Sequence, residues 1–254
     1  MPTHEQIAGG REAPQIIALF GPTGVGKTAI AVALGELLRA KGEDPVAVSA
    51  DALQVYIGLE TLTGVASPAE RAALEHRMIS FLPLDATFSV GEYAKLAHAE
   101  IVALLAAGRR PIVVGGTGLY LRAALANLSL RKVPAFDGES ELWSGETRRP
   151  TRLFGLDMDR ARLYERIDAR VDAILAGGGA EEARRADALG PGRTARKALG
   201  LNEILAGDLE TMKRRSRNYA RRQLTWMRKI PNLTTIDRGD LTDAEVAARI
   251  GSAP

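Results

Sequence analysis

Residues 21–28 read Gly-Pro-Thr-Gly-Val-Gly-Lys-Thr, the pattern of a nucleotide-binding P-loop, which belongs between a strand and a helix. An apolar run at 15–20 predicts the strand, and apolar residues at helical spacing predict a helix over 27–40. In this setting the backbone N–H groups of the loop and the helix N-terminus face a di- or triphosphate. The predicted phosphate site is therefore Gly21, Pro22, Thr23, Gly24, Val25, Gly26, Lys27 and Thr28, with Lys27 on a terminal phosphate and Thr28 as a ligand of Mg²⁺.

The rest of the chain continues the alternation of strand and helix. Apolar runs predict strands over 46–50, 111–114, 151–157 and 232–236, and amphipathic spacing predicts helices over 89–107, 117–126 and 159–175, with more helix to residue 229. This order predicts an α/β fold, a P-loop NTPase-like parallel sheet flanked by helices, with a helical, basic C-terminal region. We expect a single domain over 1–254, with a loose N-terminus at 1–14 and a surface connection at 131–150.

Composition excludes several kinds of site. The 254 residues include no cysteine, which rules out disulfides, cysteine-ligated zinc, iron–sulfur clusters and thiol catalysis. An apolar content of 46% and a charged content of 26% are those of an ordinary globular protein. No basic and apolar leader opens the sequence, and no apolar run is long enough to span a membrane. We expect a cytoplasmic monomer without membrane attachment.

Positive charge is concentrated late in the chain. The formal net charge is +3, yet residues 213–229 hold eight basic side chains and no acid, so acids are in excess elsewhere. On a helix, Tyr219, Gln223 and Trp226 share the side that would face the body, whereas Arg217 and Arg222 lie on two other sides. Such a segment has two explanations. It is either a solvated helix face or a site for an anionic partner, nucleic acid or phosphate.

Two further motifs follow predicted strands. Asp51 lies in Ser-Ala-Asp-Ala-Leu-Gln-Val-Tyr at 49–56, and Thr117 lies in Val-Gly-Gly-Thr-Gly-Leu-Tyr at 114–120. The carboxyl ends of parallel strands face the ligand crevice, so both side chains are candidates for the site. Asp51 is suited to binding magnesium, to taking a proton from an acceptor, or to capping the next helix. Thr117 is suited to hydrogen bonding a phosphate or to capping its own helix.

Together these motifs resemble the tRNA dimethylallyltransferase (isopentenyltransferase) family. The resemblance lies in GPTGVGKT at 21–28, SADALQVY at 49–56, FSVGEY at 88–93, VGGTGLYLRA at 114–123 and YARRQLTWMR at 219–228, in order over nearly the whole chain. It implies transfer of a dimethylallyl group from dimethylallyl diphosphate to N6 of an adenosine beside the anticodon of tRNA, at position 37, with Mg²⁺ as the cofactor. The implied partners are dimethylallyl diphosphate and tRNA, through its anticodon loop.

The resemblance also assigns roles to residues. The diphosphate would lie on residues 21–28, with Arg222 as a further clamp. Asp51 matches the residue that accepts the N6 proton, and Thr117 matches a position in the reaction channel. Three more residues match positions on the acceptor side: Gln54, Arg217 and Gln223.

The chain departs from the family pattern in three places. Family members typically carry a helical insertion after the GGTGLY helix, where this chain has only the short connection 131–150. Ala52 stands where the family has serine, and residues 63–68 lack a lysine of the family. Three alternatives stay open, and two of them are enzymes: the same transfer to free AMP, ADP or ATP, and a P-loop small-molecule kinase in which Arg148 and Arg149 belong to a lid. A nucleotide-binding module without catalysis is a third, which leaves Asp51, Thr117 and Arg222 without a shared purpose.

Overall fold

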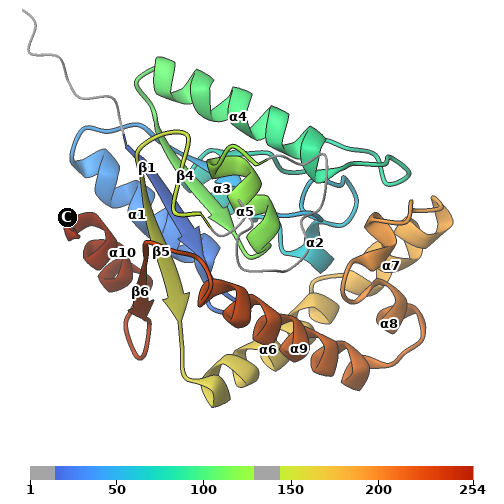
Figure 1. Cartoon of the computed structure of the whole chain (residues 1–254). Coiled ribbons are helices and arrows are strands. Elements are labelled where there is room, and N and C mark those ends of the chain that lie inside the picture. Colours follow the sequence, from blue (N-terminus) through green and yellow to red (C-terminus); the bar gives the residue numbers. More distant parts are fainter. Residues whose placement is uncertain (1–14, 129–143, 254) are drawn as a thin grey trace, which may run out of the picture.

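A computed structural model describes residues 15–128 and 144–253, and the strands of that part of the chain form one parallel sheet (Figure 1). The strands are β1 (Ile16–Phe20), β2 (Pro45–Ser49), β3 (His76–Arg77), β4 (Arg110–Gly115), β5 (Thr151–Asp157) and β6 (Leu233–Asp237). Their order is β3-β2-β4-β1-β5-β6, which puts β1 between β4 and β5. The predicted α/β fold with a parallel sheet is confirmed.

Helices cover both faces of the sheet. α1 (Lys27–Ala40), α6 (Arg160–Ala176) and α10 (Asp243–Ser252) pack on the face that carries Ile17 and Leu19 of β1. α4 (Val90–Ala106) and α5 (Gly118–Leu125) pack on the opposite face, which carries Ile16, Ala18 and Phe20. Every residue of β1 and β2 is buried, as expected for a parallel sheet that is covered on both sides.

A group of further helices, most of them short, packs beside the carboxyl edge of the sheet. It contains α2 (Glu60–Thr63), α3 (Pro68–Ala73), α7 (Gly179–Ala188), a 3₁₀ turn (Ala195–Lys197), α8 (Leu201–Leu205) and the long α9 (Leu209–Met227). An apolar cluster that includes Tyr56, Leu62, Val171, Leu201 and Met212 joins α2, α7, α8 and α9 to α6 and to the segment after β2, whereas α3 contacts α1. The helical region predicted up to residue 229 is thus divided into several helices and ends at Met227.

Four elements of the structure are absent from the sequence-based prediction: the short helices α2 and α3, the strand β3 and the helix α10. α10 begins with a capping box formed by Thr242 and Glu245, and β3, with two residues, is too short to show a periodicity. Residues 1–14 and 131–143, where we expect a loose N-terminus and a surface connection, lie outside the described residues. Residues 144–150 contain no helix or strand, and Arg122 Nη2 donates to the Ser144 carbonyl at 2.8 Å. Within the described ranges, no helix is both long and apolar enough to cross a bilayer.

Candidate active site

The P-loop follows β1 at the centre of the carboxyl edge. Gly24 and Gly26 have φ angles of 84° and 97°, in the left-handed region that favours glycine. Val25 between them is fully buried and anchors the loop in the core. Lys27 Nζ donates to the carbonyl oxygens of the first two loop residues, both at 2.9 Å. The loop therefore curls around the Lys27 ammonium at the N-terminal end of α1, where the helix dipole favours an anion.

The Lys27 ammonium is poorly compensated in this position. Burial lowers the pKa of Lys27 to about 8; the Asp51 carboxylate opposes this effect, and the Arg170 guanidinium adds to it. A buried ammonium with neighbouring positive charge gains from a polyanion placed beside it. The loop is therefore prepared for a ligand that carries several negative charges.

Asp51, Thr117 and Tyr219 form a connected group at the same edge of the sheet. Asp51 Oδ1 accepts from the Leu53 backbone N–H at 2.9 Å, which closes a short turn and caps no helix. Asp51 Oδ2 lies 3.4 Å from Thr117 Oγ1, which in turn lies 3.1 Å from the Tyr219 hydroxyl. Thr117 precedes α5 but makes no side-chain cap bond to it. The capping alternative is therefore not what the structure shows for either residue.

Tyr219 keeps its proton in this environment. Burial, and after it the Asp51 charge, raises the pKa of Tyr219 to about 12. Its hydroxyl is therefore neutral at physiological pH. It contacts the Thr117 hydroxyl, which donates to the carboxylate, without adding charge.

One cavity of about 1060 Å³ connects the P-loop with this group. It is lined by the P-loop, by the segments after β2 and β4, and by α6 and α9. Its lining has two acids, Asp51 and Glu70, and six basic residues: Lys27, Arg166, Arg170, Lys197, Arg215 and Arg222. The excess of positive charge attracts anions, and the volume is sufficient for a ligand of several functional groups.

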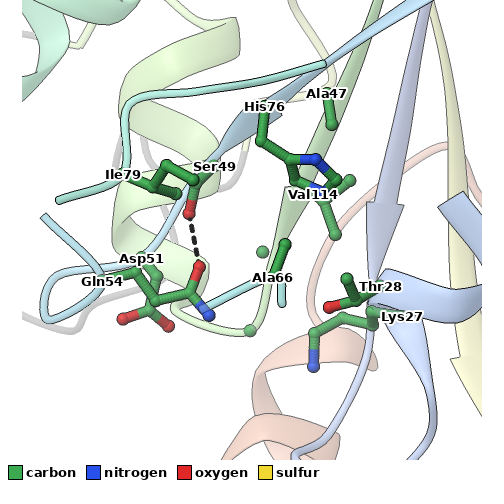
Figure 2. A pocket seen from close by; sticks show the side chains of 12 residues that line it. Lys27, Thr28, Ala47, Ser49, Asp51, Gln54, Ala66, His76, Ile79 and Val114 are labelled. Carbon is green, nitrogen blue, oxygen red and sulfur yellow. Dashed lines mark hydrogen bonds between the residues drawn. The ribbon is translucent and has the colours of Figure 1, made fainter. Parts of the chain in front are cut away.

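A small chamber of about 40 Å³ adjoins the cavity on the side of the sheet. Figure 2 shows Ser49 hydrogen-bonded to Gln54, with the His76 ring near Val114 and with Lys27 and Thr28 below it. The His76 Nδ1 lies 2.6 Å from the Leu74 carbonyl, and burial lowers the pKa of His76. His76 is therefore neutral at physiological pH. The chamber has room for water molecules and not for a substrate group.

Two of the residues predicted on the acceptor side use their amides within the protein. Gln54 Nε2 donates to the Gly64 carbonyl at 3.0 Å. Gln223 is 4% exposed; its Oε1 accepts from the Thr23 N–H at 2.7 Å, and its Nε2 donates to the Gly116 carbonyl at 2.8 Å. Gln223 therefore joins the P-loop to the turn after β4. Both side chains also line the cavity.

The two arginines predicted from the motifs have different surroundings. Arg222 lines the cavity, with its guanidinium carbon 5.5 Å from the centre of the Tyr219 ring. Arg217 is absent from the lining, and its Nη1 lies 2.6 Å from both carboxylate oxygens of Asp168 on α6. The structure thus brings Asp51, Gln54, Thr117, Arg222 and Gln223 together with the P-loop. It places Arg217 at the contact between α6 and α9.

Arg170 and Tyr219 belong to the site although the sequence analysis assigns neither a role: Arg170 lies outside the motifs, and Tyr219 opens the motif at 219–228. The Arg170 guanidinium lies over Gly64, where a Cβ would overlap with it. Burial lowers the pKa of Arg170, opposed by Asp51, and among the described residues no carboxylate or carbonyl hydrogen-bonds to it. Such a guanidinium is suited to an incoming anion. The sequence signal was Arg166 and Arg170 one turn apart on a predicted helix, but only the fold shows that this face turns toward the P-loop.

Sequence comparisons agree with the motifs. The sequence model of the family described as IPP transferase matches residues 54–143 and 134–230. The tRNA dimethylallyltransferases of Salinispora tropica and Rhodospirillum centenum are 33% and 35% identical to this chain, over 87% and 90% of its length and 88% and 93% of theirs. The first alignment spans 287 residues, more than the 254 of this chain, so that relative contains residues which this chain lacks.

Solved structures share the fold. The tRNA isopentenylpyrophosphate transferase of Bacillus halodurans is 27% identical with a TM-score of 0.80, over 93% of this chain and 94% of that one. The tRNA delta(2)-isopentenylpyrophosphate transferase of Staphylococcus epidermidis is 26% identical with a TM-score of 0.78, over 94% of this chain and 98% of that one. With the P-loop, Asp51 and Thr117 in one cavity, this likeness in sequence and fold shows that the chain belongs to the tRNA dimethylallyltransferase (IPP transferase) family.

Proposed function

We propose that the chain transfers the dimethylallyl group of dimethylallyl diphosphate to the exocyclic N6 of the adenosine at position 37 of tRNA, beside the anticodon. The observation that carries the proposal is the Asp51 carboxylate, which lies beside Thr117 in the cavity that the P-loop also lines. A phosphate cradle and a carboxylate in one basic cavity suit a reaction in which a diphosphate leaves while an amine loses a proton. The names of the relatives support tRNA as the acceptor.

The P-loop binds the diphosphate of the donor. Lys27 exchanges its carbonyl partners for phosphate oxygens, whose negative charge favours the ammonium form. The bridging oxygen gains negative charge as the C–O bond breaks, so Lys27, Arg222 and the loop N–H groups stabilise the transition state more than the bound donor. Arg170 adds positive charge from the wall formed by α6.

Asp51 acts on the acceptor amine. The nitrogen lone pair of an exocyclic amine is delocalised into the purine ring, so the amine is a weak nucleophile and its N–H becomes acidic only as the new bond forms. Asp51, with one oxygen held by the Leu53 N–H, accepts this proton as a general base. The C–N bond forms, the C–O bond to the diphosphate breaks, and the proton passes from N6 to the carboxylate. Thr117 and Tyr219 orient the second carboxylate oxygen.

The cavity suits a magnesium ion that is held mainly by the substrate. Among residues 15–128 and 144–253, no group of three or more His, Cys, Asp or Glu side chains is placed to hold a metal ion. Mg²⁺ commonly takes one or two protein oxygens together with phosphate oxygens and water. Thr28, which lines the cavity beside Lys27, would hold it there. When bound, the ion neutralises charge on the diphosphate.

The basic face of α9 is the proposed contact for the anticodon loop. Arg214 and Arg221 are exposed on one side of this helix, and Arg228 is exposed directly after its end. Arg222, on another side, is also exposed and lines the cavity. A base in an anticodon loop has to leave its stack to reach such a cavity, and phosphate contacts hold the loop while it does so. The two stretches matched by the family model meet at residues 134–143, within the connection 131–150. We propose that this connection replaces the insertion of the longer family members.

A labelling experiment tests the proposal against its alternatives. The protein and Mg²⁺ are incubated with labelled dimethylallyl diphosphate and either unmodified tRNA or AMP, and a tRNA with guanosine at position 37 is the control. Label in the unmodified tRNA alone is the expected result, and Asp51→Asn should abolish most of it. Label in AMP alone would support the adenylate transferase, and consumption of ATP without labelling would support the kinase.

A further inference from the structure

Two arginines contact carbonyl oxygens of the P-loop. Arg238 Nη1 donates to the Val25 carbonyl at 2.7 Å, and Arg166 Nε donates to the Gly24 carbonyl at 2.8 Å. Arg238 is 8% exposed, and a Cβ on Gly26 would overlap with its guanidinium. Arg166 also lines the cavity, yet the reaction described above assigns neither side chain a direct contact with the substrates.

The topology of the sheet explains why these side chains meet at the loop. β1, β5 and β6 are parallel neighbours, so their carboxyl ends lie together. β1 continues into the P-loop, β5 leads to α6 with Arg166, and β6 ends immediately before Arg238. The Arg238 N–H donates to the Asp157 carbonyl at 2.9 Å, and its guanidinium pairs with Asp243 of α10 at 2.8 Å. Arg238 is therefore held by β5 and by α10 while it contacts the loop.

The geometry of the peptide group connects these contacts with the bound phosphate. In a trans peptide unit the C=O and the N–H point in opposite directions. The Gly24 carbonyl shares its unit with the Val25 N–H, and the Val25 carbonyl shares its unit with the Gly26 N–H. Arg238 on the Val25 carbonyl therefore directs the Gly26 N–H to the phosphate side. The Val25 N–H donates to the Pro22 carbonyl at 3.4 Å, so Arg166 on the Gly24 carbonyl fixes the turn that places the next peptide unit. The charge of the two arginines also polarises the two units, which makes each N–H a stronger donor.

We propose that Arg166 and Arg238 are positioning residues for the donor diphosphate, which act through the carbonyl side of the P-loop and make diphosphate affinity depend on the end of β6 and on α10. This inference rests on the proposed function, because it requires a diphosphate on the loop. It adds to that function a contribution from residues whose polar contacts are to the protein backbone and to Asp243.

Four variants test the inference: Arg166→Gln, Arg238→Gln, Arg238→Lys and the control Arg162→Gln. Arg162 lies one turn from Arg166 on α6 and pairs with the exposed Asp240 at 2.5 Å, so its replacement removes a nearby charge without touching the loop. The measurements are the Kd of inorganic pyrophosphate with Mg²⁺ by calorimetry, the KM for dimethylallyl diphosphate and for tRNA, and the Tm without ligand.

A charge-assisted hydrogen bond to the loop predicts a rise in the pyrophosphate Kd of about fivefold for Arg166→Gln and about tenfold for Arg238→Gln. The KM for dimethylallyl diphosphate should rise by similar factors while the KM for tRNA stays unchanged. Arg238→Lys keeps a charged donor, so its Kd should recover to within about threefold of the unchanged protein, and Arg162→Gln should stay within about twofold.

Three results would overturn the inference. The first is an unchanged pyrophosphate Kd in folded Arg166→Gln and Arg238→Gln while the unchanged protein binds normally, which leaves the proposed function intact. The second is an equal loss of affinity in Arg162→Gln, which would show a general charge effect. The third is no pyrophosphate binding by the unchanged protein, which refutes the donor site itself. Arg238→Gln also removes the ion-pair partner of Asp243. If that variant does not fold, the result for Arg166→Gln, whose side chain is exposed, decides whether the inference holds.

Discussion

The variant Gln223→Leu tests which of two roles the Gln223 side-chain amide has: a bridge between the P-loop and the turn after β4, or a contact with the acceptor. Leucine has a similar volume but removes both hydrogen bonds, which leaves the Thr23 N–H and the Gly116 carbonyl without their partner. Each buried polar group that loses its partner costs about 1–3 kcal/mol. Thr23 lines the cavity, so water compensates part of its loss. We therefore expect the free energy of unfolding to fall by about 2–3 kcal/mol.

The assay is thermal unfolding of the ligand-free protein, followed by circular dichroism or calorimetry. For a chain of this size, 1 kcal/mol corresponds to about 2–4 °C, so the Tm of Gln223→Leu should fall by about 4–12 °C. Thr225→Ala is the matched control: Thr225 is exposed on the same helix and donates only to the Arg221 carbonyl. Its free energy of unfolding should change by less than about 0.5 kcal/mol.

Kinetics complete the test of Gln223. Because the bridge holds the P-loop, Gln223→Leu should raise the KM for dimethylallyl diphosphate as well as lower the Tm. A Tm within about 1 °C of the unchanged protein, together with a raised KM for tRNA alone, would refute this reasoning. It would then favour the acceptor-binding role that the motifs predict.

Three further predictions concern the cavity. Asp51→Asn should lower kcat by about 10²–10⁴-fold, as the loss of a general base does, while calorimetry shows a much smaller change in the pyrophosphate Kd; equal losses would make Asp51 a binding residue. Arg170→Gln should raise the same Kd about tenfold, and an unchanged Kd would mean that its guanidinium does not meet the diphosphate. Since burial lowers the pKa of Lys27 to about 8 from 10.5, the ligand-free native state binds fewer protons than the unfolded chain between these values. Stability should therefore rise with pH across that window, and denaturant unfolding of Lys27→Met should lack this contribution.

At the carboxyl edge of the sheet, the sequence predicts the arrangement of the elements well where a local pattern determines the structure. The helix predicted over 27–40 coincides with α1, because the P-loop spacing marks its start and Lys41-Gly42 marks its end. Asp51 and Thr117 come together because each follows a strand of one parallel sheet. These positions follow from rules that operate over a few residues.

Such local rules do not predict hydrogen bonds and ion pairs between side chains and segments that are distant in the sequence. Helical periodicity correctly predicts that Gln223 faces the body of the protein. It cannot predict the hydrogen bond between the Gln223 amide and Thr23, because Thr23 lies 200 residues away in the sequence. Arg217 resembles a substrate contact in the motif, yet α6 brings Asp168 next to it. Arg238 has no sequence signal at all, because its contact with the P-loop requires the order of β1, β5 and β6 in the sheet.

Two of the long-range contacts of the P-loop have a consequence for the order of folding. Thr23 meets Gln223 and Val25 meets Arg238 across separations of 200 and 213 residues, and contacts that close such long loops form late. During synthesis the P-loop emerges well before α9 and β6. A diphosphate that binds only the finished loop stabilises the native state alone. Bound dimethylallyl diphosphate should thus protect from proteolysis only those chains in which α9 and the end of β6 have already packed against the P-loop.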